Sequence, residues 1–116
     1  MSQKLMITIA ARQIECIRIN SPEIEHLDPD LMGTSRAAKQ IIYFDGTSDP
    51  FNTLLHEIAH VYNYFTGQRH VSRSDEETSE WCGCFVSQLM IENGPHIFED
   101  LLIFAKTGAL PKWNEE

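Results

Sequence analysis

The sequence predicts a small α+β domain, in which a mixed β-sheet from the N-terminal half packs on two or three helices. Two isoleucine-rich stretches, Leu5 to Ile9 and Ile14 to Ile19, alternate with polar residues at the period of half-buried strands. Lys39 to Asp45 is rich in branched and aromatic residues, which favour a third strand. Apolar residues then recur at helical spacing through the second half of the chain.

Length and charge limit the classes of protein to which this chain can belong. At 116 residues the chain is expected to form a single domain, residues 1–116. Its 17 acidic and 9 basic residues give a net charge of −8, which argues against nucleic-acid or anionic-membrane partners because those need a positive field. No run approaches the ~18 apolar residues of a membrane span, and the N-terminus resembles a strand more than a signal peptide. We therefore expect a cytoplasmic protein whose oligomeric state stays open.

Proline, glycine and capping residues mark a connector after the second strand and both ends of the first long helix. Residues 21–35 contain prolines and a glycine and are expected to form a connector with room for one short helix. The helix is expected from Asp49 to Phe65, with an N-cap oxygen from Ser48 or Asp49 and Pro50 in its first turn. Gly67 is expected to end it as a C′ residue.

Two further helices are expected after this one. The second begins at Ser74 or Asp75, where Glu77 occupies the capping-box position relative to Ser74, and it stops at Asn93-Gly94-Pro95. The third runs roughly from His96 to Lys106 and closes on Gly108.

The first long helix carries the motif His-Glu-Ile-Ala-His, residues 56–60, at its centre. Side chains at i and i+4 of a helix lie one above the other, so His56 and His60 can direct an imidazole nitrogen toward one cation. Glu57 projects about 100° further round the helix, where its carboxylate reaches a metal-bound water instead of the metal. This arrangement predicts a zinc hydrolase in which Glu57 is the catalytic base. A surface helix with two incidental histidines is the alternative.

Catalytic zinc usually takes three protein ligands, so one more must come from outside the motif helix. We expect Glu77, because it shares one stripe of the second helix with Trp81, Cys84 or Phe85, and Gln88. Glu80 is a candidate partner for an imidazole N–H, and Glu76 is better explained as a solvated residue that suits the helix dipole. Glu76, Glu80 and His70 are the alternatives to Glu77 as third ligand.

Residues near the motif limit the subclass and supply candidates for oxyanion stabilisation. The metzincin pattern needs a glycine and a histidine where this chain has Asn63 and Thr66, so that subclass is excluded. A cationic or phenolic donor near the metal would stabilise the oxyanion of a tetrahedral intermediate. The candidates are His70, Arg69, Arg73, and Tyr62 or Tyr64.

Three cysteines, Cys16, Cys82 and Cys84, are an odd number in a chain with no export signal, so we expect reduced thiols. Cys82 and Cys84 lack the second pair that a zinc knuckle requires. They are expected to be small core residues and not metal ligands.

Several of these segments together resemble the small phage and mobile-element zincins related to the ImmA/IrrE metallopeptidases. The resemblance covers about residues 31–93: the strand Ile41-Ile-Tyr-Phe-Asp, the stretch Thr53-Leu-Leu-His-Glu-Ile-Ala-His, and Glu76-Glu-Thr-Ser-Glu-Trp-Cys-Gly-Cys-Phe-Val. It implies a minimal zincin-like domain of the gluzincin type, with the HExxH helix central. It also implies His56, His60 and Glu77 as zinc ligands and Glu57 as base.

This resemblance implies a zinc-dependent peptidase that cuts a protein or peptide substrate, such as a regulator. In a zincin an edge strand beside the metal pairs with an extended substrate, and Lys39 to Asp45 is the expected edge strand. Within these 116 residues we expect no helix-turn-helix or other accessory domain that would deliver a substrate. One alternative is a zincin-fold protein that binds metal and a partner without cutting it. The other is a small helical interaction protein without metal. Two histidines and a carboxylate suit zinc best, with manganese or iron as the other candidates.

Overall fold

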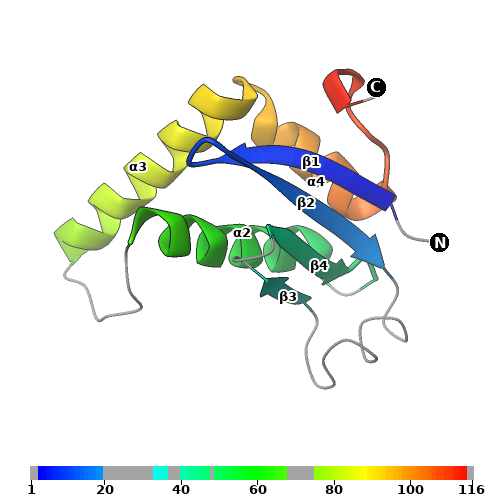
Figure 1. Cartoon of the computed structure of the whole chain (residues 1–116), viewed down its shortest axis with the longest axis horizontal. Coiled ribbons are helices and arrows are strands. Elements are labelled where there is room, and N and C mark those ends of the chain that lie inside the picture. The colour runs from blue at the N-terminus through cyan, green and yellow to red at the C-terminus, as the bar shows by residue number, and fades with distance from the viewer. Residues whose placement is uncertain (1–2, 20–32, 37–39, 48, 68–74, 115–116) are drawn as a thin grey trace.

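A computed structural model describes residues 3–19, 33–36, 40–47, 49–67 and 75–114 of the chain (Figure 1). It confirms the predicted α+β architecture, with a mixed sheet and three helices. In chain order the elements are β1 (Gln3–Ile9), β2 (Arg12–Ile19), β3 (Gly33–Arg36), β4 (Ile41–Asp45), α2 (Pro50–Thr66), α3 (Asp75–Asn93), α4 (Ile97–Thr107) and the 3₁₀ turn η2 (Lys112–Asn114).

The four strands form one sheet in the order β1-β2-β4-β3. β1 and β2 form an antiparallel hairpin, β2 and β4 run parallel, and β3 pairs antiparallel with β4. The parallel pair is what makes the sheet mixed. The two N-terminal strands and the strand before the motif helix therefore match the predicted ones.

The position of β4 in the sheet corrects one expectation. β4 pairs on both sides, with β2 and with β3, so Ile41–Asp45 is not an edge strand. The edge beside it is β3, which lies in the segment expected to be a connector. Its four residues, Gly-Thr-Ser-Arg, have no apolar alternation, so periodicity could not have revealed this strand. The expected helix within residues 21–32 falls outside the described residues.

One face of the sheet packs on α2 and α4 and forms the main core (Figure 1). Alternate strand residues point into it, and they meet apolar rows from the helices. Phe44 of β4 and Phe104 of α4 meet edge to face with ring centroids 5.8 Å apart. The opposite face carries a smaller cluster of Ile17 and Ile19 with Ile41 and Tyr43. The residues that bury their side chains in the main core are Leu5, Ile7, Ile9, Ile14, Cys16, Ile42, Phe44, Leu54, Ile58, Val61, Tyr62, Phe85, Leu89, Ile97, Leu101, Phe104 and Ala105.

The motif helix α2 begins and ends as expected, except for its cap. Pro50 occupies the first turn, and Gly67 closes the helix at φ 74°, donating its N–H to the Asn63 carbonyl. Asp49 is the N-cap residue, but its side chain caps no backbone N–H. Its φ of 44° gives Asp49 a left-handed backbone, and its carboxylate accepts from the Asn52 amide instead.

Helix α3 passes the hairpin end of β1, and α4 follows it after Gly94 (Figure 1). The predicted third helix is confirmed to within a residue at each end, with Gly108 closing it at φ 79°. The predicted second helix is also confirmed, and its expected cap Ser74 lies outside the described residues. Cys82 and Cys84 are exposed on α3, so the expectation that they are core residues was wrong. The side of α3 that faces the domain is the side of Phe85 and Leu89, which leaves both cysteines in solvent.

Candidate metal centre on helix α2

The centre of the candidate site is the pair of imidazoles on α2. His56 is exposed and His60 is half-buried, one turn apart on the same side of the helix. Their Nε2 atoms are 3.0 Å apart, and the ring planes stand at 80° with centroids 4.6 Å apart. The two Nε2 atoms therefore lie within hydrogen-bonding distance of each other on one side of the helix.

This geometry fits a tetrahedral metal ion. Zinc binds imidazole nitrogen at roughly 2.0–2.1 Å, so two nitrogens on one tetrahedral zinc lie about 3.3 Å apart. The observed separation of 3.0 Å is within a few tenths of an ångström of that spacing. An imidazole–imidazole hydrogen bond, in which one Nε2–H donates and the other Nε2 accepts, accounts for the same separation.

The packing of α2 explains why the pair faces outward. Leu54, Ile58 and Val61 are fully buried and hold the opposite side of the helix on the sheet. His56 and His60 lie on the other side, at the border between helix and solvent. The hydrophobic row and the histidine pair are thus two faces of one amphipathic helix.

Glu57 lies between these two faces. Its side chain is 8% exposed, and it is buried beside Thr53, one turn earlier. Because consecutive residues differ by about 100° around a helix, Glu57 lies about 100° from His56 and about 60° from His60, between the histidine pair and the buried apolar row. The burial of Glu57 distinguishes it from His56, which is exposed, and His60, which is half-buried.

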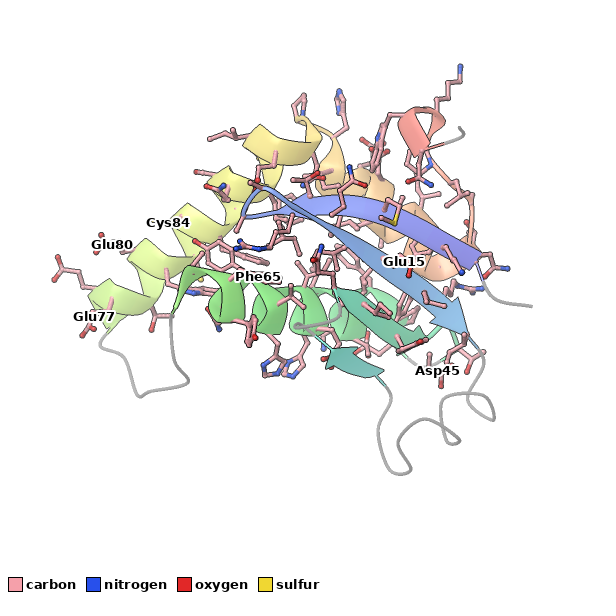
Figure 2. All side chains as sticks on the ribbon, viewed as in Figure 1. Glu15, Asp45, Phe65, Glu77, Glu80 and Cys84 are labelled. Carbon is pink, nitrogen blue, oxygen red and sulfur yellow. The ribbon has the colours of Figure 1, made fainter. Side chains whose placement is uncertain are left out.

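The structure does not bring the expected third ligand to the histidine pair. Glu76, Glu77 and Glu80 are all exposed, and Figure 2 shows Glu77 and Glu80 on the N-terminal half of α3, away from the sheet. Within the described ranges, no group of three or more His, Cys, Asp or Glu side chains is gathered closely enough to hold a metal. Glu77 stays a prediction, and His70, Arg69 and Arg73 lie outside the described residues.

The two tyrosine candidates for oxyanion stabilisation are now distinguished by burial. Tyr62 is buried and packs edge-on against Trp81 and Phe85, at centroid distances of 5.8 and 5.1 Å. Tyr64 is exposed and lies one turn beyond His60. Of the two, Tyr64 keeps the access to solvent that a substrate contact needs.

Asn63 is a polar residue near the site that the sequence did not single out. It is buried, one turn beyond His60, and its Oδ1 accepts a hydrogen bond of 2.8 Å from the Trp81 indole. This bond joins α2 to the turn of α3 that follows Glu77. An asparagine inside a helix gives no periodic signal, so only the tertiary contact reveals this role.

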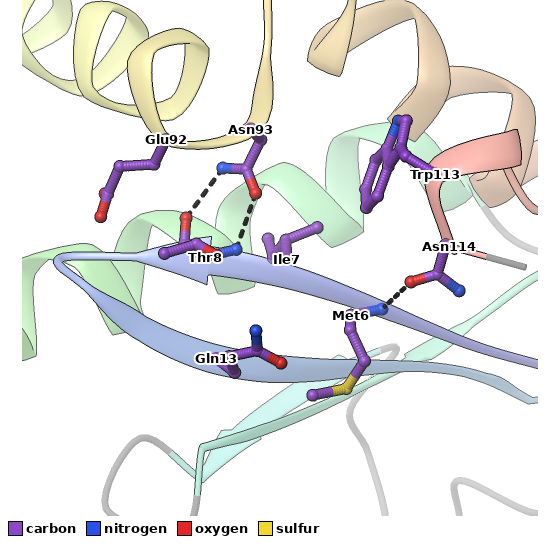
Figure 3. A pocket seen from close by; sticks show the side chains of 8 residues that line it. All are labelled: Met6, Ile7, Thr8, Gln13, Glu92, Asn93, Trp113 and Asn114. Atoms are coloured by element: carbon purple, nitrogen blue, oxygen red, sulfur yellow. Dashed lines mark hydrogen bonds between the residues drawn. The ribbon is translucent and has the colours of Figure 1, made fainter. Parts of the chain in front are cut away.

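A surface cavity lies at the outer edge of β1, away from α2. A cavity of about 430 Å³ is bounded there by the end of α3, by the C-terminal segment and by β1 (Figure 3). The Asn93 amide bonds both the N–H and the carbonyl of Thr8, and Asn114 accepts from the Met6 N–H. Side-chain amides thus occupy the strand edge where another strand would pair.

Comparisons of the chain with protein-family models, curated proteins and solved structures find no match. Among the helices described, none is both long enough and apolar enough to cross a membrane.

Proposed function

We propose that this protein is a zinc-dependent metallopeptidase with a minimal zincin-like domain, as the resemblance to the ImmA/IrrE metallopeptidases implies. The observation that carries the proposal is the approach of the two Nε2 atoms of His56 and His60 to 3.0 Å on adjacent turns of α2. A single carboxylate, Glu57, follows the first histidine directly. The substrate would be a peptide bond in a protein, and the protein itself would be cytoplasmic.

The chain's own residues would then divide the work of hydrolysis. His56 and His60 would hold the ion, which supplies Lewis acidity toward water and toward the peptide carbonyl. Glu57 would take a proton from the attacking water as its oxygen bonds to the carbonyl carbon. The same carboxylate would give that proton to the nitrogen of the leaving amine as the C–N bond breaks. Of the two tyrosine candidates, Tyr64 is the exposed one and would contact the carbonyl oxygen.

Glu77 is our proposed third ligand. It lies one turn of α3 before Trp81, and Trp81 is held to Asn63 beside the histidine pair. Glu77 would reach the ion by a change in the first turn of α3. Two imidazoles and one carboxylate are a ligand set that suits zinc.

A second candidate is a metal-binding protein of zincin fold that binds a partner without cutting it. The exposed position of Glu77 on α3, away from the sheet (Figure 2), favours this alternative, because hydrolysis needs a complete set of ligands. Peptidase activity with and without the Glu57 carboxylate separates the two candidates.

The first experiment measures metal content per chain by mass spectrometry, on protein purified without a histidine tag. We expect about one zinc per chain. We also expect the free energy of unfolding to rise by roughly 2.7 kcal/mol when free zinc exceeds its Kd a hundredfold. His56→Ala and His60→Ala should each abolish both effects. His96→Ala is the matched control, because His96 is an exposed histidine at the start of α4.

Zinc binding by variants identifies the third ligand, and hydrolysis by a further variant identifies the base. Glu77→Gln should weaken zinc binding by more than roughly tenfold, since even the loss of an outer-shell partner costs that much. Glu76→Gln and His70→Ala should change it little. Glu57→Gln should keep zinc while losing hydrolysis of a generic protein substrate. Wild-type protein that takes up no zinc and gains no stability from it would refute the proposal.

A further inference from the structure

Helix α3 contacts the rest of the domain along a narrow seam. Between Glu76 and Ile91 the covered side chains are Trp81, Phe85, Gln88 and Leu89, which recur at the spacing of one helical stripe. The other residues of this stretch are exposed. Most of the circumference of α3 therefore faces solvent.

The exposed side of α3 carries large apolar residues, where a surface helix is usually polar. Val86 is 40% exposed, Met90 37% and Ile91 80%. Cys82, Val86 and Met90 follow each other at intervals of four, so they form one row along the helix. Gly83 lies beside this row, and a Cβ placed there would meet nothing within 4 Å. A helix that is apolar on its packed side and on its outer side is normally covered on both.

The charges of α3 are of one sign. The helix contains Asp75, Glu76, Glu77, Glu80 and Glu92 and no lysine or arginine. Glu76 and Glu80 are exposed. On a helical wheel they fall about 80° and 120° from Val86, between the row of Val86 and Met90 and the side of Ile91. Acidic residues at one end and apolar residues at the other end thus share one exposed side.

We propose that this surface, defined by Glu76, Glu80, Cys82, Val86, Met90 and Ile91, docks a basic amphipathic helix of a partner protein. The apolar row offers anchor positions at the spacing by which helices bind helices, and the carboxylates attract lysine or arginine flanking the partner's apolar side. A second copy of this chain is a poorer occupant because it brings further acidic residues to an acidic surface. The net charge of −8 likewise disfavours an anionic membrane.

The test uses a labelled leucine–lysine peptide about 15 residues long, with leucines at helical spacing, and its leucine–glutamate counterpart. Fluorescence anisotropy at about 0.15 M salt should give a micromolar Kd for the lysine peptide and at least roughly tenfold weaker binding for the glutamate peptide. Val86→Ser combined with Met90→Gln should weaken lysine-peptide binding by roughly tenfold. Ile103→Gln is the control, because Ile103 is an apolar residue on α4 that is slightly more exposed than Val86 and Met90.

Charge is tested in the same way. Glu80→Gln should weaken binding and flatten its salt dependence, whereas Glu99→Gln, an exposed carboxylate on α4, should not. As a second measurement that needs no variant, bound lysine peptide should slow alkylation of Cys82.

Four outcomes would overturn the proposal. The first is unchanged binding in the Val86 and Met90 variant together with unprotected Cys82. The second is equal loss of binding in the Ile103 and Glu99 controls. The third is concentration-dependent dimerisation of the wild-type chain that the α3 variant abolishes, which would make a second copy the occupant. The fourth is adsorption to lipid vesicles through the same residues.

Discussion

The three cysteines differ sharply in their surroundings. Cys16 lies on β2 with its side chain fully buried in the main core, and this burial raises the pKa of its thiol well above the ordinary value of 9.0. Cys82 and Cys84 are exposed on α3. The chain therefore combines one protected thiol with two accessible ones.

We predict that a thiol reagent labels Cys82 and Cys84 in the native protein and Cys16 only after unfolding. Reagents react with the thiolate, which burial disfavours at Cys16. Peptide mass spectrometry of native and urea-unfolded samples would identify the modified positions. Rapid labelling of Cys16 in the native state would contradict the buried position of this residue.

The buried thiol of Cys16 also makes the stability of the fold decrease as the pH rises into the alkaline range. Below pH 9.0 its thiol is neutral in both states, so its contribution to stability is constant. Above that pH the unfolded chain loses the proton while the folded chain keeps it, so stability falls by up to about 1.36 kcal/mol per pH unit. Urea unfolding between pH 8 and about 10.5 should show a steeper decline for wild type than for Cys16→Ala. Equal slopes would show that the folded thiol also ionises in this range.

The β1–β2 hairpin is held in a costly backbone conformation by a residue distant in sequence. Ala10 and Ala11 both have positive φ, 50° and 66°, in the left-handed region that alanine disfavours. The Glu92 carboxylate accepts hydrogen bonds from both of their N–H groups, at 2.8 and 2.6 Å. The C-terminal end of α3 therefore stabilises a turn that its own residues do not favour.

We predict opposite effects from changing the turn and changing its clamp. Ala11→Gly should stabilise the protein by roughly 0.5–1 kcal/mol, because glycine adopts positive φ without the steric cost. Glu92→Ala should destabilise it by roughly 1.5–3 kcal/mol, the value of hydrogen bonds to a charged group. Urea titrations monitored by tryptophan fluorescence would measure both. Glu80→Ala on the same helix is the control and should stay within about 0.5 kcal/mol of wild type.

Arg18 connects segments from three parts of the molecule. Its guanidinium donates to the carbonyls of Ala105 and Lys106 at the end of α4, to the Gly46 carbonyl after β4, and to the Gln3 side chain on β1. A cation at the end of α4 also suits the negative end of the helix dipole. Gly46 leaves room for this group, since a Cβ there would lie 2.6 Å from Arg18 Cζ and Nε.

We predict that Gly46→Ala destabilises the whole domain by roughly 1–3 kcal/mol, because the guanidinium must leave its carbonyl partners. Gly46 has no positive φ, so backbone strain does not confound the comparison. Gly83→Ala is the matched control. It enters open space within α3 and should stabilise by roughly 0.5–1 kcal/mol. Global urea unfolding would measure both, and a neutral Gly46→Ala would show that Arg18 repositions at no cost.

Helix positions and most strands could be predicted from the sequence because they depend on local patterns. The bounds of α2 and α4 follow from Pro50, Gly67 and Gly108, and the hairpin strands follow from alternating isoleucines. The strand β3 and the inner position of β4 could not be predicted. Pairing between distant segments is decided by the competition among all strands for partners, which no local window contains.

The candidate site likewise has one part that local patterns predict and another part that they do not. The histidine pair could be predicted because i and i+4 on one helix meet whatever the fold. Other features depend on which side of each helix faces the rest of the domain. They are the roles of Tyr62 and Tyr64, the exposure of Cys82 and Cys84, and the contact of Asn63 with Trp81. Periodicity gives the angular position of each of these residues around its helix. It does not tell which side of the helix the rest of the domain covers.

The sequence by itself determined the three helices, three of the four strands and the two imidazoles that could share one metal ion. Local periodicity decides the first two, and helix geometry brings residues four apart together. Only the tertiary structure decided that β4 is internal, that Glu92 supports the β1–β2 turn, and that α3 presents an apolar, acidic side to solvent. These features arise from contacts between residues far apart in the chain. Their energies depend on the relative placement of whole elements, and that placement is reached only when the core closes.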